Sequence, residues 1–147
     1  MSRAAGTVLA FDFGKRFIGV AVGEHETRSA HPLAMIDAVA AEARFGAIER
    51  LVREWRPTLL VVGKPLALDG TPHAMTHAAE RFARALAARF RLPVARVDER
   101  LTSAEAAINL RAIGRGGRRG KDLTHSVAAQ IILQDYFDTL ATEAHCP

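Results

Sequence analysis

The sequence predicts an α/β fold in which a mixed five-stranded sheet carries helices on both faces. Three apolar segments follow one another near the N-terminus with short turns between them, which is typical of antiparallel strands. Beyond them, segments with apolar residues at helical spacing alternate with short apolar runs, which is the order of strands joined by helical crossovers. The chain has 147 residues, 49% of them hydrophobic, so we expect one compact domain over residues 1–147.

The first three strands are expected at residues 7–13, 17–23 and 30–36. A tight turn at Gly14 and Lys15 joins the first two as a hairpin. Gly19 and Gly23 lie within the second strand and carry no side chain. We therefore expect something large to approach the backbone closely at these two positions.

The remaining elements are expected to alternate between helix and strand. Ile48, Leu51 and Trp55 lie at helical spacing, and Pro57 ends the helix that they define. Helices are expected at residues 38–55, 72–90, 103–113 and 123–140, and strands at residues 58–62 and 93–97.

Several classes of protein are excluded by composition. Cys146 is the only cysteine, so the chain has no internal disulfide and no thiolate pair for zinc. No apolar stretch approaches the roughly 20 residues of a membrane-spanning helix, and the N-terminus lacks the pattern of a signal peptide. We expect a cytoplasmic protein without a membrane partner.

Positive charge is concentrated in one segment. Residues 111–121 contain five basic residues and no acidic one, and the other 15 basic and 16 acidic residues nearly cancel. Glycines separate the basic residues, which predicts a mobile cationic loop that binds a phosphate backbone without recognising bases. A solvated basic linker is the alternative. The residues concerned are Arg111, Arg115, Arg118, Arg119 and Lys121.

Asp12 is the first candidate functional residue, because it follows the apolar run from Val8 to Phe11. Burying an ionised carboxylate beside apolar side chains is costly unless a cation or several hydrogen bonds compensate it. A metal or substrate at this position would supply that compensation. Hydrogen bonds from the following turn would do the same, because aspartate beside glycine commonly caps a turn.

Four segments resemble the YqgF/RuvX family, a Holliday-junction-resolvase-like group assigned to pre-16S rRNA maturation. They are residues Asp12 to Ala21, Val61 to Leu66, Val97 to Ser103 and Ala128 to Gln134, in the order of the family. The resemblance implies a ribonuclease-H-like fold of three layers. It also implies a metal-dependent nuclease that processes the 5′ end of pre-16S rRNA. We expect a monomer or a weak homodimer.

In that fold, carboxylates from separate elements hold one or two Mg²⁺ or Mn²⁺ ions for phosphodiester hydrolysis. The resemblance places one acid among Asp98, Glu99 and Arg100. Adjacent strand residues point to opposite faces, so only one of the two acids can readily face Asp12. We favour Glu99 because its side chain is longer, with Asp98 as the alternative. An ion pair with Arg100 would be a purely structural role for this tripeptide.

The third ligand is expected from the start of the last helix, where the sequence departs from the family pattern. The resemblance implies an aspartate eight residues before Leu133, and this chain has His125 there. We expect either metal binding by His125, which would suit Mn²⁺ better than Mg²⁺, or a surface histidine. Asp122 lies three residues earlier, and we expect it to cap the helix, with a metal-binding role as the alternative.

Four further basic residues are candidates for phosphate contacts along the same edge, although each could equally be a solvated charge. They are Lys15, Arg16, Lys64 and Arg100.

Three other functions stay open at the level of sequence. Resolution of Holliday junctions in DNA is the rival substrate within the family. A non-catalytic nucleic-acid-binding module is the second alternative, because His125 departs from the metal-ligand pattern. An ATP-dependent enzyme of the actin-like class is the third, although such proteins need a second domain and a further glycine-rich motif, which this chain lacks.

Overall fold

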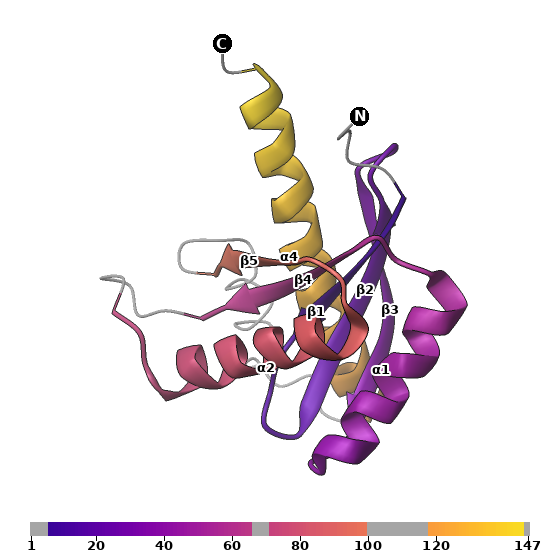
Figure 1. Cartoon of the computed structure of the whole chain (residues 1–147), viewed down its shortest axis with the longest axis vertical. Helices are drawn as coiled ribbons and strands as arrows, with labels where there is room; N and C mark the ends of the chain where they lie inside the picture. The colour runs from indigo at the N-terminus through magenta and orange to yellow at the C-terminus, as the bar shows by residue number, and fades with distance from the viewer. Residues whose placement is uncertain (1–5, 66–70, 100–117, 146–147) are drawn as a thin grey trace.

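The computed structural model describes residues 6–65, 71–99 and 118–145, which form a five-stranded sheet with helices on both faces (Figure 1). The strands are β1 (Thr7–Asp12), β2 (Phe17–Glu24), β3 (Ser29–Asp37), β4 (Leu59–Lys64) and β5 (Val94–Asp98), and the helices are α1 (Ala41–Trp55), α2 (Ala74–Phe90) and α4 (Arg118–His145).

The sheet is mixed, with strand order β3-β2-β1-β4-β5. Strand β2 pairs with β1 and β3 in antiparallel fashion, whereas β4 runs parallel to both β1 and β5. The predicted fold class is therefore confirmed, including the N-terminal hairpins and the later crossovers. In this topology β1, β4 and β5 end at the same edge of the sheet.

Two apolar layers separate the sheet from its helices. Leu9 and Phe11 of β1 pack with Ile48 of α1 and Leu86 of α2, and the neighbouring positions on β1 pack against α4. Figure 1 shows α1 and α2 on one face and α4 crossing the other. The central strands are buried on both faces, which explains why they are continuous apolar runs rather than alternating ones.

The helix starts differ from the predicted ones by a few residues. Helix α1 begins at Ala41 rather than at residue 38, because Ala40 is still extended. Helix α2 begins at Ala74 rather than at residue 72. His73 is its N-cap, and the His73 ring accepts a hydrogen bond from the backbone N–H of Met75 at 3.2 Å.

Helix α4 is longer than predicted at both ends, and it corrects two expectations. Arg118, Arg119 and Lys121 belong to the helix, not to a cationic loop. Arginine and lysine are good helix formers, and the extension tolerates Gly120 at a cost of about 1 kcal/mol. Asp122 lies inside the helix, so the predicted N-cap role is wrong.

Some expectations fall outside the described residues. These are the helix at residues 103–113 and the basic residues Arg100, Arg111 and Arg115. Within the described ranges, no helix is both long enough and apolar enough to cross a membrane.

The close approach predicted at Gly23 is made by α4 and by the neighbouring strand β3. A Cβ atom on Gly23 would lie 2.8 Å from Cε2 of Phe137 and 2.6 Å from the backbone oxygen of Ser29. Gly46 in α1 has the opposite environment, because a Cβ atom there would meet nothing within 4 Å.

We predict opposite effects for the same substitution at these two glycines. Gly23→Ala should lower the free energy of unfolding by about 1–3 kcal/mol, because α4 must move away from the sheet. Gly46→Ala should raise it by about 0.5–1 kcal/mol, because alanine restricts the unfolded chain at no steric cost. Urea unfolding measures both. Equal destabilisation by the two variants would contradict the packing described here.

Candidate active site

The candidate site lies on the α4 face of the sheet, where β1, β4 and β5 end. Asp12 is the last residue of β1, and it follows Phe11, which is in register with Val62 of β4. The next β4 residue is Gly63, which is in register with Val97 of β5. Asp12 and Gly63 therefore occupy neighbouring positions on adjacent parallel strands.

Glu99 lies directly over Gly63. Its backbone N–H donates to the Lys64 carbonyl oxygen at 3.1 Å, which continues the β5 pairing by one residue. A Cβ atom on Gly63 would lie 2.6 Å from Glu99 Oε2. Glu99 is only 8% exposed, so the missing side chain at Gly63 provides the space that this carboxylate occupies.

Asp98 lies on the opposite face of the sheet. Side chains alternate along a strand, so Asp98 shares its face with Arg96. Arg96 forms an ion pair with Glu80 of α2 at 2.9 Å, which identifies that face as the α2 side. Glu99 and Asp12 therefore share the α4 face, and Asp98 does not. The catalytic roles of these acids stay predictions.

His125 lies beside β2, the strand that pairs with the Asp12 end of β1. Asp12 is in register with Gly19 of β2, and a Cβ atom on Gly19 would overlap the backbone oxygen of His125. The His125 ring stacks on Phe17, with 5.0 Å between ring centroids and 25° between planes. Gly19 thus allows α4 to begin its crossing of the sheet beside Asp12.

The described residues contain no group of three or more His, Cys, Asp or Glu side chains that could hold a metal ion. Asp12, Glu99 and His125 are thus not gathered into one such cluster in that part of the chain. The side chain of Asp122 lies outside the description. The donors that suit a hard divalent cation are the carboxylates of Asp12 and Glu99, whose strands β1 and β5 flank β4 at Gly63.

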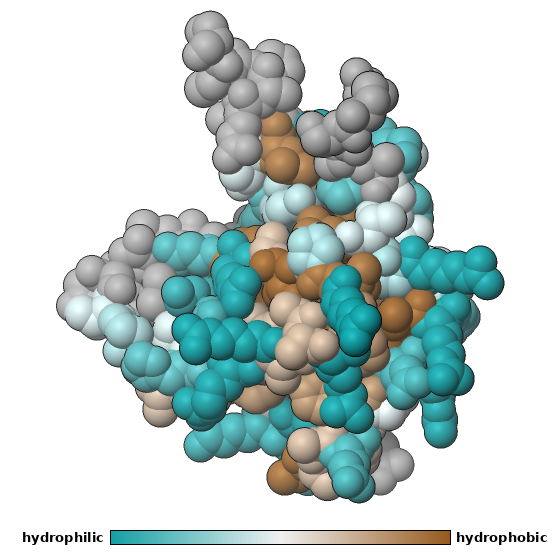
Figure 2. All heavy atoms as spheres, in the orientation of Figure 1, coloured by the Kyte–Doolittle hydropathy of each residue, from teal (hydrophilic) through white to brown (hydrophobic). Residues whose placement is uncertain are grey.

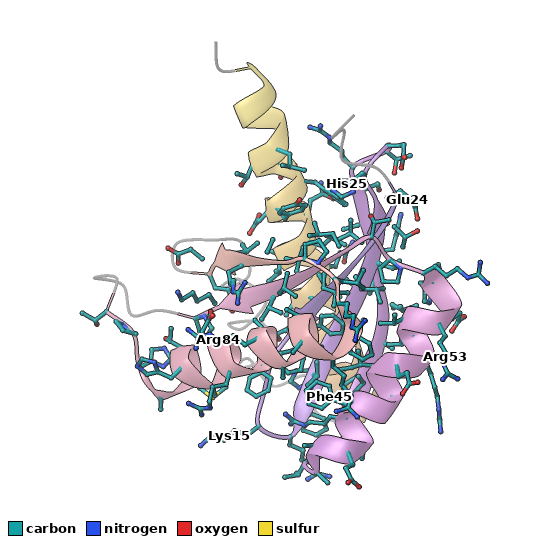
Figure 3. The ribbon with its side chains drawn as sticks, viewed as in Figure 1. Lys15, Glu24, His25, Phe45, Arg53 and Arg84 are labelled. Atoms are coloured by element: carbon teal, nitrogen blue, oxygen red, sulfur yellow. The ribbon has the colours of Figure 1, made fainter. Side chains whose placement is uncertain are left out.

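The predicted basic residues differ in their surroundings. Lys15 is exposed on the loop after Asp12 (Figure 3). Arg16 donates to Asp37 Oδ1 at 3.0 Å and covers the Phe17 ring at 5.1 Å, so its charge is already paired. Lys64 is in register with Asp98, and by alternation it lies on the α2 side. Of these three, only Lys15 has an exposed side chain without a described ion-pair partner.

Sequence reasoning missed Arg44, which holds the loop beside Asp12. The buried Arg44 guanidinium donates to the Gly14 oxygen at 2.7 Å and to the Ala38 oxygen at 2.5 Å, and lies over the Phe13 ring at 5.3 Å. Burial lowers the pKa of this guanidinium. Arg44 precedes Ile48 by four residues, so its position on the buried face of α1 was visible in the helical periodicity.

Residues 6–139 match the family named RuvX and described as Holliday junction resolvase. The chain belongs to the RuvX family. A protein of Methylobacillus flagellatus named "Putative pre-16S rRNA nuclease" is 55% identical over 137 residues, which cover 93% of this chain and 94% of the relative. A protein of Dechloromonas aromatica with the same name is 55% identical over 134 residues, which cover 91% and 92%.

A solved structure of RuvC from T. thermophilus, in complex with a Holliday junction substrate, is similar in fold to this RuvX chain. The TM-score is 0.54, with 16% identity, over 93% of this chain and 96% of the RuvC chain. The fold is therefore ribonuclease-H-like.

We predict that Arg44→Met loosens the loop that follows Asp12. Two carbonyl oxygens lose a charged donor, so the free energy of unfolding should fall by about 2–4 kcal/mol. Amide hydrogen exchange should accelerate at residues 13–16. Arg53→Met is the matched control, because Arg53 is 79% exposed and, among the described residues, forms an ion pair only with Glu49. It should change stability by less than about 0.5 kcal/mol. Unchanged exchange at residues 13–16 would show that Arg44 does not hold this loop.

Proposed function

We propose that this chain is a single-domain, metal-dependent nuclease that hydrolyses phosphodiester bonds in the 5′ region of pre-16S rRNA in the cytoplasm. The observation that carries the proposal is the placement of Asp12 and Glu99 on one face of the sheet, on either side of Gly63. Two carboxylates from separate strand ends are the arrangement that such chemistry requires.

Asp12 and Glu99 would hold the cation, either Mg²⁺ or Mn²⁺. A bound divalent cation lowers the pKa of its water and stabilises negative charge on the phosphate. The backbone of Glu99 is positioned by its hydrogen bond to the Lys64 oxygen. Because the Glu99 side chain is buried, its carboxylate can adopt few rotamers. Asp12 is held by the β1–β2 pairing and by the loop that Arg44 supports.

The names of the curated relatives favour pre-16S rRNA as the substrate. The description of the family favours a Holliday junction instead. Symmetric cleavage of a junction needs two active sites, hence a dimer. Cleavage of a pre-16S fragment and of a four-way DNA junction by the same protein sample distinguishes the two substrates. A protein that binds either one but cleaves neither would be a non-catalytic module.

We predict that the two acids on the α4 face are required for cleavage and that their neighbour is not. Asp12→Asn and Glu99→Gln should each lower the cleavage rate by at least about a hundredfold, the scale for loss of a group that stabilises transition-state charge. Asp98→Asn is the matched control on the α2 side and should cleave at nearly the wild-type rate. Asp12→Asn should not lower the thermal midpoint in EDTA, because it removes repulsion between carboxylates. Normal cleavage by Asp12→Asn would place the active site elsewhere.

The histidine at position 125, where the family pattern has an aspartate, leads to a separate prediction about metal preference. If the imidazole is a ligand, Mn²⁺ should support faster cleavage than Mg²⁺, and His125→Asp should move the preference toward Mg²⁺. His31→Ala removes an exposed histidine from β3 and serves as the control. Full activity and an unchanged metal preference in His125→Ala would make His125 a packing residue that stacks on Phe17.

A further inference from the structure

Three non-glycine residues in the described part of the chain have left-handed backbones, and all three are arginines. Their φ angles are 52° at Arg28, 47° at Arg56 and 54° at Arg91. Side chains with a Cβ atom are strained in this region, and glycine or asparagine is the usual occupant. Arginine at a strained position motivates the hypothesis that its side chain has a use.

The three arginines lie along one edge of the sheet, opposite the candidate active site. Arg28 is in the β2–β3 turn, and Arg56 and Arg91 are the C-caps of α1 and α2. In Figure 1 the β2–β3 turn lies at the upper right, the α1–β4 connection at the right and the α2–β5 connection nearer the centre. We call these three residues the arginine row.

Backbone hydrogen bonds hold the three connections side by side. The N–H of His25 donates to the Gly6 oxygen at 3.0 Å, and the N–H of Thr58 donates to the Thr7 oxygen at 2.8 Å. The N–H of Leu60 donates to the Pro93 oxygen at 3.0 Å. The three connections therefore lie at the same ends of nearby strands in the sheet.

The arginine row is exposed and has no acidic partner among the described residues. Arg53 pairs with Glu49, and Arg84 and Arg96 pair with Glu80, but no ion pair includes a member of the row. The nearby acids Glu24 and Glu26 accept hydrogen bonds from Thr7 and Gly6. The surrounding face is rich in hydrophilic side chains (Figure 2).

We propose that the arginine row binds the phosphate backbone of the RNA substrate, away from the cleavage site. This inference rests on the proposed nuclease function and deepens it. The guanidinium group is suited to phosphate because its planar donors can bind two oxygens at once. A favourable effect of arginine on the helix dipole could explain Arg56 and Arg91, but it does not explain Arg28, which follows no helix.

The row and the active site lie at opposite ends of the central strands. Strand β1 spans six residues, so the two edges are roughly 20 Å apart at about 3.3 Å per residue. A structured RNA of pre-rRNA size can reach both edges, whereas an oligonucleotide of a few nucleotides cannot. The row should therefore determine the affinity for long RNA and leave cleavage of a short substrate unchanged.

The test is the triple variant Arg28→Gly, Arg56→Gly, Arg91→Gly, which removes three charges and relieves the left-handed strain. Binding to a structured pre-16S fragment is measured by fluorescence anisotropy in EDTA over a range of salt concentrations. We expect about tenfold weaker binding and a salt slope smaller by about two to three, because each phosphate contact releases counterions. The thermal midpoint should be unchanged or higher.

The control variant replaces three exposed arginines inside α1 and α2 by glutamine, Arg53→Gln, Arg81→Gln and Arg84→Gln, which also removes three charges. It should keep most of the affinity. Equal weakening by both triple variants would overturn the arginine row as a specific surface. An unchanged affinity and salt slope in the glycine variant would also overturn it, as would a lower thermal midpoint with unchanged RNA binding.

Two further measurements separate this inference from the proposed function. Cleavage of a short oligonucleotide by the glycine variant should match the wild type, and a parallel loss of short-substrate cleavage would contradict a role confined to binding. If the wild-type protein cleaves no RNA, the nuclease proposal fails, while the anisotropy titration still decides the arginine row. A loss of binding to duplex DNA with no loss for RNA would overturn RNA as the occupant.

Discussion

Helix α4 can lie close to the sheet only because three strand positions carry no side chain. Gly19, Gly23 and Gly63 face it, and a Cβ atom at any of them would lie within 3 Å of α4 or of Glu99. The candidate site depends on this contact. The end of α4 that carries His125 meets β2 at Gly19, opposite Asp12, and Glu99 occupies the space over Gly63 beside Ile132. A single layer of packing therefore supports the fold and places α4 beside Asp12 and Glu99.

Much of the fold could be predicted because its signals are local. Apolar runs, turn residues and helical spacing predicted the five strands and the helices on both faces, with errors at the ends of the elements. Alternation of side chains along a strand predicted that only one of the two adjacent acids can face Asp12, but it did not decide between Asp98 and Glu99, and Glu99 was favoured for its longer side chain. Gly19 and Gly23 indicated a close approach, although the sequence did not identify α4 as the partner.

The features that the sequence did not predict have a different origin, because most of them depend on contacts between segments far apart in the chain. Arg44 lies 30 residues after the Gly14 carbonyl that it binds, and nothing near Gly14 indicates that a donor will arrive from α1. The start of α4 was placed too late because glycine and basic residues suggested a loop. The helix nevertheless continues to Arg118, which removes Asp122 from the N-cap position. The left-handed backbones of Arg28, Arg56 and Arg91 had no signal in the sequence, since glycine or asparagine would be expected there.

We propose that Asp12 and Glu99 hold a divalent cation between them, on the α4 face of the sheet. Crystals grown with Mn²⁺ test it most directly, through an anomalous difference map recorded near the manganese absorption edge. We expect a peak within about 2.0–2.6 Å of carboxylate oxygens of both Asp12 and Glu99, the distance typical of oxygen ligands to such cations. A well-ordered site without a peak, or a peak bound by Asp98 on the α2 side, would contradict it.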